Sequence, residues 1–75
     1  MLHGVKEGVL KEVRLLAIHG SPYCDVYFQL AGQPEGQVGS GRIGTESIHA
    51  DAKSGDQVRL HFVMNLLVRV ERVEA

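Results

Sequence analysis

The chain has 75 residues, 44% of them hydrophobic, and its eight Lys and Arg oppose nine Asp and Glu for a formal charge of -1. This length fits one domain, residues 1–75, and the balanced charge and high hydrophobic fraction exclude a disordered chain. The longest apolar stretch, residues 60–68, is far shorter than the ~20 residues of a membrane span. The start of the sequence has no apolar segment of signal-peptide type, and the single Cys24 cannot form an internal disulfide, so we expect a cytoplasmic protein.

The first structured segment, residues 9–18, fits two patterns. Val13, Leu15 and Ala17 alternate as in a strand, whereas Leu10, Val13 and Ala17 lie on one face of a helix. A Gly-Ser-Pro turn at 20–22 stands at hairpin distance from the next apolar segment, which favours the strand. That next segment, residues 24–30, alternates clearly and predicts a strand with Tyr27 on the face opposite its apolar residues.

The middle of the chain is less regular. Residues 32–44 contain five glycines and a proline around Val38 and Ile43, which indicates a loop leading into a short, irregular strand. Residues 46–53 fit one or two helical turns after Thr45 as N-cap, and they also fit an extended segment. We find no internal repeat and no low-complexity tract.

Residues 57–64 form the clearest alternating segment, with Val58, Leu60, Phe62 and Met64 on one face, and residues 66–73 alternate again. A straight strand over 57–73 would measure about 56 Å at ~3.3 Å per residue. A domain of this size is only about 25 Å across. The chain must therefore turn near 64–66, where Asn65 best accepts a left-handed conformation.

These segments predict an all-β fold, a small closed barrel of five strands in which one short helix over 46–53 is allowed. OB-like and SH3-like barrels have this length. The segment Lys53-Ser54-Gly55-Asp56-Gln57-Val58 resembles the turn that enters a strand in many such barrels. A domain this small buries little apolar surface, so we also expect self-association to contribute to its stability.

Few residues suggest catalytic or metal chemistry. Residues 39–44 match the pattern G-x-G-x-x-G, but the strand-helix-strand unit of a dinucleotide site has no room in the remaining chain. We therefore expect a loop or bulged strand there, with an anion site at Arg42 as the weaker alternative. Only His49 and Asp51 have a local metal-ligand spacing, and two ligands do not make a structural zinc site. We predict no metal, no cofactor and no catalytic residue, and we interpret Cys24 as a small packed side chain.

Nucleic-acid binding is an open alternative, because small barrels often bind single strands through exposed aromatic residues flanked by arginine. Tyr27, Arg59 and Arg69 would be the contact residues. The charge argues against it, since a surface that follows phosphates is usually basic. Pairing between charges on neighbouring strands explains the arginines equally well.

The leading hypothesis is a non-enzymatic binding module that forms a homo-oligomer through its C-terminal hairpin. The apolar run 62–68 is nearly continuous, so Val63 and Leu67 should lie on the face opposite the core. A partner molecule or a second copy would then be needed to cover that face. A further alternative is an oligomeric enzyme with its active site at a symmetry axis. The predicted interface comprises Phe62, Val63, Met64, Leu66 and Leu67.

Overall fold

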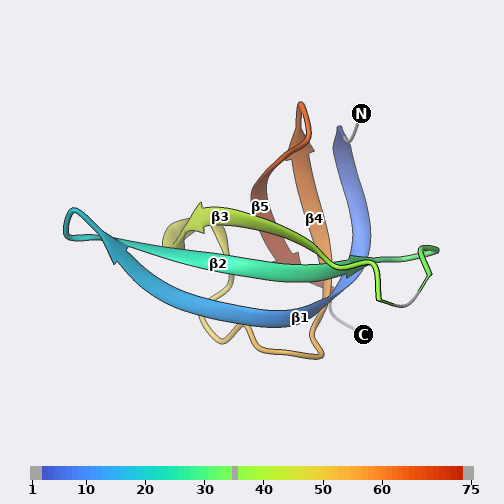
Figure 1. Ribbon diagram of the computed structural model, residues 1–75, viewed down its shortest axis with the longest axis horizontal. Coiled ribbons are helices and arrows are strands. Elements are labelled where there is room, and N and C mark those ends of the chain that lie inside the picture. The colour runs from blue at the N-terminus through green and yellow to red at the C-terminus, as the bar shows by residue number, and fades with distance from the viewer. Residues whose placement is uncertain (1–2, 35, 74–75) are drawn as a thin grey trace.

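The computed structural model describes residues 3–34 and 36–73, which form one antiparallel sheet of five strands in the order β3-β2-β1-β4-β5 (Figure 1). The all-β prediction is confirmed. Among the described residues, no helix has the length and apolarity of a membrane span. The elements are β1 (Gly4–Ile18), β2 (Ser21–Leu30), β3 (Gly39–Gly44), the 3-10 helix η1 (Thr45–Ser47), β4 (Gln57–Val63) and β5 (Leu66–Arg72).

Strand β1 is long and curved, and it joins the two halves of the sheet. Its first part pairs with β4 from Gly4 to Val9, and it pairs with β2 from Gly8 onward. At Gly8 a Cβ atom would lie 2.5 Å from the carbonyl oxygen of Gln29, so only glycine allows this close approach. A bulge at Lys11 then shifts the register and increases the bend. As Figure 1 shows, β1 therefore turns from the direction of β4 into that of β2.

The ambiguous segment 9–18 is strand, as the hairpin spacing favoured. The turn is shorter than predicted, because only His19 and Gly20 lie between β1 and β2, with φ of 50° and 80°. Two residues with positive φ give the turn type whose twist matches the flanking strands. Strand β2 accordingly begins at Ser21, three residues before the predicted start.

The glycine-rich segment 39–44 forms β3, as predicted for a short strand. Its glycines allow the backbone to approach the core, since a Cβ at Gly41 would lie 2.7 Å from the Cβ of Leu67 on β5. Strands β3 and β5 thus pack side by side, but no ladder joins them among the described residues. The predicted closed barrel is therefore not formed, because the sheet stays open between these two strands.

The chain turns at Met64 and Asn65, where it was expected to turn, and both residues have positive φ. The helix allowed over 46–53 is reduced to η1, and Ile48 is already extended. Turns follow up to the start of β4, with the amide of Ala52 donating to the carbonyl of His49. Ile48 and Ala52 pack against the core from this irregular segment, a placement that does not require a helix.

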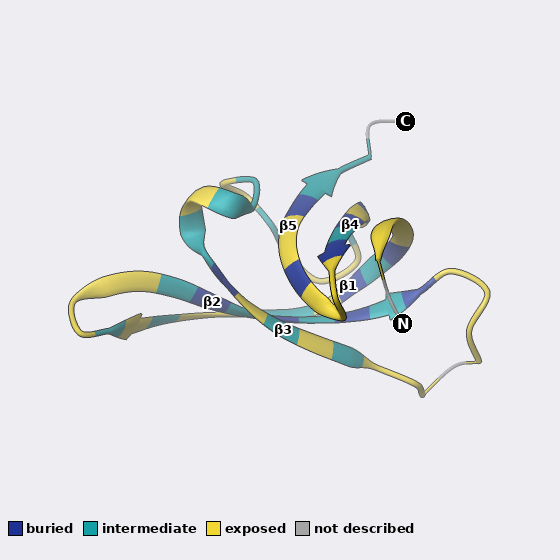
Figure 2. Cartoon of the chain, turned by 90° about the horizontal axis from the view of Figure 1, so that it is seen from above, coloured by how far each residue is buried: buried dark blue, intermediate teal, exposed yellow. Residues whose placement is uncertain are grey.

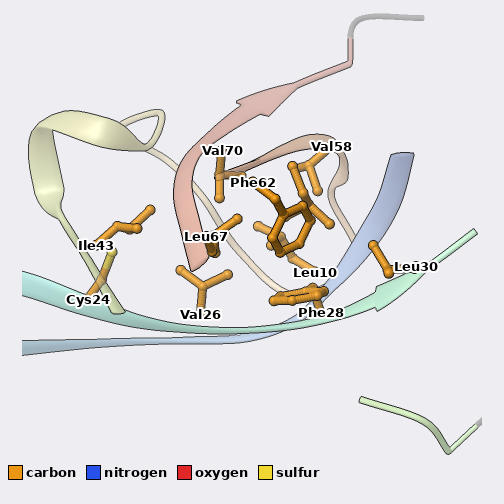
Figure 3. Close-up of a cluster of buried hydrophobic side chains, with 11 residues drawn as sticks. Leu10, Cys24, Val26, Phe28, Leu30, Ile43, Val58, Phe62, Leu67 and Val70 are labelled. Carbon is orange, nitrogen blue, oxygen red and sulfur yellow. The ribbon is translucent and has the colours of Figure 1, made fainter. Parts of the chain in front are cut away.

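The core lies between the β1-β2-β3 layer and the β4-β5 hairpin, as Figure 3 shows. Its centre is an edge-to-face pair of Phe28 and Phe62, with ring centroids 5.7 Å apart. Cys24 is buried beside Ile43, as expected for a small packed side chain. The described buried hydrophobic residues are Leu10, Cys24, Val26, Phe28, Leu30, Ile43, Val58, Leu60, Phe62, Leu67 and Val70.

The substitution Gly41→Ala should destabilise the fold by about 1–3 kcal/mol, because the new methyl group overlaps the backbone-proximal Cβ of Leu67. Gly44→Ala is the matched control in the same strand, since its Cβ would meet only the mobile carboxyl end of Glu46. Urea unfolding of both variants measures the difference. Equal unfolding midpoints would contradict the close approach of β3 to β5.

Candidate functional site

The first candidate surface surrounds Tyr27 on the outer face of β2, where the sequence placed it. Tyr27 lies between Glu12 on β1 and Ser40 on β3. The guanidinium carbon of Arg14 is 5.7 Å from the centre of the Tyr27 ring, which is a cation–π distance. Arg42 lines the same shallow depression, together with Ser40. We call Arg14, Tyr27, Ser40 and Arg42 the tyrosine surface.

Carboxylates neutralise both arginines of the tyrosine surface. Arg42 donates to the two carboxylate oxygens of Asp25 at 2.7 and 3.2 Å, and this pairing lowers the pKa of Asp25. Arg14 forms an ion pair with Glu12. A ligand of this surface therefore meets an aromatic ring and arginine planes without a net positive charge.

Arg59 and Arg69 lie elsewhere, on the outer face of the β4-β5 hairpin. Arg59 stands between Glu7 and Glu71 in the sheet register, and Arg69 is opposite His61. His61 in turn hydrogen-bonds to Glu71 and lowers the pKa of that carboxyl.

The structure does not bring Tyr27 together with these two arginines. On β1, Tyr27 is aligned with Glu12 and Arg59 with Glu7, on the two sides of the bend. The cationic neighbours of Tyr27 are instead Arg14 and Arg42. Arg42 on β3 could not be identified from the sequence as a neighbour of Tyr27, because this neighbourhood depends on the β2-β3 register.

The second candidate surface is the tip of the β4-β5 hairpin, where the predicted interface residues divide into two groups. Phe62 and Leu67 are only 3% and 7% exposed and belong to the core. Val63, Met64 and Leu66 are 46%, 67% and 69% exposed. The exposed group lies next to the start of β1, since Gly4 pairs with Phe62 (Figure 1).

The expected outward orientation of Leu67 is wrong. The register shifts between His61 and Phe62, so that His61 faces Arg69 and Phe62 faces Leu67, and Val68 is the extra residue. This bulge turns Leu67 inward and leaves Val68 42% exposed. The simple alternation of the sequence could not show it. We call Val63, Met64, Leu66 and Val68 the hairpin patch, and it is exposed in Figure 2.

The remaining candidates have structural partners. His49 contacts Asp56 at 3.0 Å rather than Asp51, and Asp51 pairs with Arg72 instead. Within residues 3–34 and 36–73, no group of three or more His, Cys, Asp or Glu could hold a metal ion. Burial raises the pKa of the Cys24 thiol, which disfavours the nucleophilic thiolate.

Acidification should destabilise the protein. Hydrogen bonds from Arg42, Arg72, His49 and His61 lower the pKa of four carboxyl groups below their usual values of 3.8 and 4.5. The unfolded chain then binds more protons at acid pH, so stability is complete above about pH 4.5 and decreases as the pH falls through the lowered pKa values. The four groups are those of Asp25, Asp51, Asp56 and Glu71.

Urea midpoints between pH 7 and pH 3 measure this effect, and Asp56→Asn should show a smaller loss on acidification. A midpoint that stays constant down to pH 3 would show that these pairs do not contribute to folding.

No protein-family model, curated protein or solved structure matches the chain.

Proposed function

We propose that the protein is a non-enzymatic binding module of OB-like architecture that self-associates through the hairpin patch. The strand order, with β1 shared between two strand pairs and β3 packed beside β5, supports the OB-like assignment over the SH3-like one. OB-folds are five-stranded and partly open barrels, which agrees with the gap between β3 and β5.

The exposure of the hairpin patch carries the proposal. Val63 and Leu66 are direct cross-strand partners, and Met64 lies in the turn between them. Four neighbouring apolar side chains that are 42–69% exposed form one surface. Covering this surface would remove apolar area from water and so stabilise a small monomer. The patch consists of apolar side chains, which favours a plain contact between copies over an oligomeric enzyme with its active site at a symmetry axis.

Backbone strain at Met64 supports the same conclusion. Its φ of 49° places it in the left-handed region, where a residue other than glycine or asparagine costs about 1–2 kcal/mol. The strained backbone thus belongs to a residue whose side chain is 67% exposed. A contact with a second copy would give the exposed methionine a favourable role, because methionine adapts well to apolar interfaces.

The substitution Met64→Gly separates association from folding. It relieves the left-handed strain but adds unfolded-state entropy, so the free energy of unfolding should change by less than about 1 kcal/mol. Loss of the apolar side chain should raise the dissociation constant about tenfold or more. Native mass spectrometry across a dilution series measures this change.

The matched control is His19→Gly, which relieves the same strain in the β1-β2 turn. It should leave the dissociation constant unchanged. Equal association by wild type and Met64→Gly would place the contact elsewhere.

Single-stranded nucleic acid at the tyrosine surface is a second candidate. The outer face of β2 and β3 is the face that OB-folds use for oligonucleotides. The stacking of Arg14 on Tyr27 and the position of Arg42 beside it favour base stacking there. Because Glu12 and Asp25 neutralise these arginines, we expect weak binding with a shallow salt dependence.

Fluorescence anisotropy with a labelled oligothymidine tests this candidate. Tyr27→Ala should weaken binding about fivefold or more, since stacking contributes about 1–3 kcal/mol per base. The control is Arg59→Ala combined with Arg69→Ala on the other strand pair. If only the double arginine variant lost affinity, the contact would be on the β4-β5 face.

A further inference from the structure

Among residues 3–34 and 36–73, no strand lies beside one edge of β1 beyond its bend. Strand β4 pairs with β1 only up to Val9, whereas β1 continues to Ile18 along β2. At Leu10 the backbone amide and carbonyl bond to Asp56 and Gly55. After that residue, no strand of the described chain lies on this side of β1. Figure 1 shows the β1-β2 hairpin extending beyond the rest of the sheet.

The hydrogen-bonding direction along this edge follows from the turn. Ile18 and Ser21 close a two-residue turn and so exchange backbone hydrogen bonds with each other. Because the direction alternates along an antiparallel strand, the amides and carbonyls of Val13, Leu15 and Ala17 point away from β2. They present three regularly spaced donor and acceptor pairs to a further strand.

This edge has little of the usual protection against pairing. Edge strands are commonly protected by proline, by charged side chains, above all lysine, or by a bulge. Residues 12–18 contain neither proline nor lysine, their two charged residues Glu12 and Arg14 form an ion pair with each other, and the bulge at Lys11 lies before them. Leu15 is 79% exposed, more than any other exposed large hydrophobic residue described.

We propose that the β1 edges of two copies pair antiparallel about a two-fold axis at Leu15. In this register Leu15 faces Leu15 of the second copy, and Val13 faces its Ala17. All three outward-pointing residues then exchange hydrogen bonds, and Arg14 faces an apolar Leu16. A second copy fits because its edge has the same antiparallel backbone and the same spacing.

The neighbouring registers are less favourable. Moving the axis to Arg14 places two arginines opposite each other. Moving it to Val13 brings Leu16 opposite Leu10, whose backbone groups are already bonded to Gly55 and Asp56. Moving it toward Ala17 shortens the paired segment. The axis at Leu15 thus gives the longest pairing without like charges in opposition.

This interface is separate from the hairpin patch and does not depend on it. It would join the β3-β2-β1 strands of both copies into one continuous sheet and bring two tyrosine surfaces onto it. Two different two-fold contacts on one chain generate a tetramer if they close.

Native mass spectrometry of Leu15→Lys, Met64→Gly and the double variant tests the proposal. Leu15→Lys should fold normally, because the side chain is exposed, and it should halve the mass of the wild-type assembly. Val38→Lys is the matched control, an exposed apolar residue in the β2-β3 loop, and it should leave the mass unchanged. A wild-type mass in Leu15→Lys would overturn the β1 interface.

The two proposals fail in different ways. With both contacts present, each single variant is a dimer and the double variant is a monomer. If only the β1 contact exists, wild type and Met64→Gly are dimers and Leu15→Lys is a monomer. If only the hairpin contact exists, Leu15→Lys remains a dimer and Met64→Gly is a monomer.

Disulfide trapping determines the register. Paired residues of this type have Cα atoms about 5.5 Å apart, within the range that a disulfide spans. Under mild oxidation Leu15→Cys should form a covalent dimer with itself. Val13→Cys should not couple with itself but should couple with Ala17→Cys when the two are mixed. Coupling of Leu15→Cys no faster than that of Ser40→Cys on the distant β3 would contradict the pairing.

Discussion

The bend in β1 positions both halves of the sheet. One strand pairs with β4 near its start and with β2 along most of its length. A straight β1 would produce a flat sheet, and a flat sheet of this size has no second layer to bury its apolar face. Gly8 and the bulge at Lys11 turn the strand, so that the β4-β5 hairpin folds over β2 and β3 (Figure 2). The side chains between these layers form the core.

The same geometry leaves two parts of the sheet without cover. A small core can be wrapped by only part of each long hairpin, so the β1-β2 arm and the β4-β5 tip extend past it. Apolar side chains on these extensions, Leu15 on one and Met64 and Leu66 on the other, remain exposed. The exposure is thus a consequence of small size, and the proposed association would cover it.

Charge pairing limits what the outer faces can bind. Arg14 and Arg42 each have a carboxylate partner beside Tyr27, and Arg59 lies between two glutamates. A polyanion would have to displace these carboxylates before gaining the arginines. An uncharged or weakly charged ligand would meet the ring and the guanidinium planes without that competition.

Local signals determined much of the fold from the sequence alone. Alternation predicted the strands around 24–30 and 57–64, and turn chemistry placed a reversal near 19–22. The length of the segment 57–73, compared with the size of the domain, placed another reversal near 64–66, where Asn65 is the best turn residue. These features depend on neighbouring residues, so they are visible without the rest of the chain. The apolar run 62–68 likewise predicted that a hairpin would carry more apolar surface than one core needs.

The residues that form the two surfaces are set by contacts between distant parts of the chain. The bulge at Val68 reverses the orientation of Leu67, and it arises from pairing with β4 rather than from local preference. The bend in β1 separates Tyr27 from Arg59 and Arg69. The β2-β3 register places Arg42 beside Tyr27 instead. The glycines of β3 were compatible with a loop or a bulged strand in the sequence, and pairing with β2 makes them a strand, in which Leu67 leaves no room for a side chain at Gly41. Register and close packing involve residues far apart in the chain, and a local pattern contains no information about either.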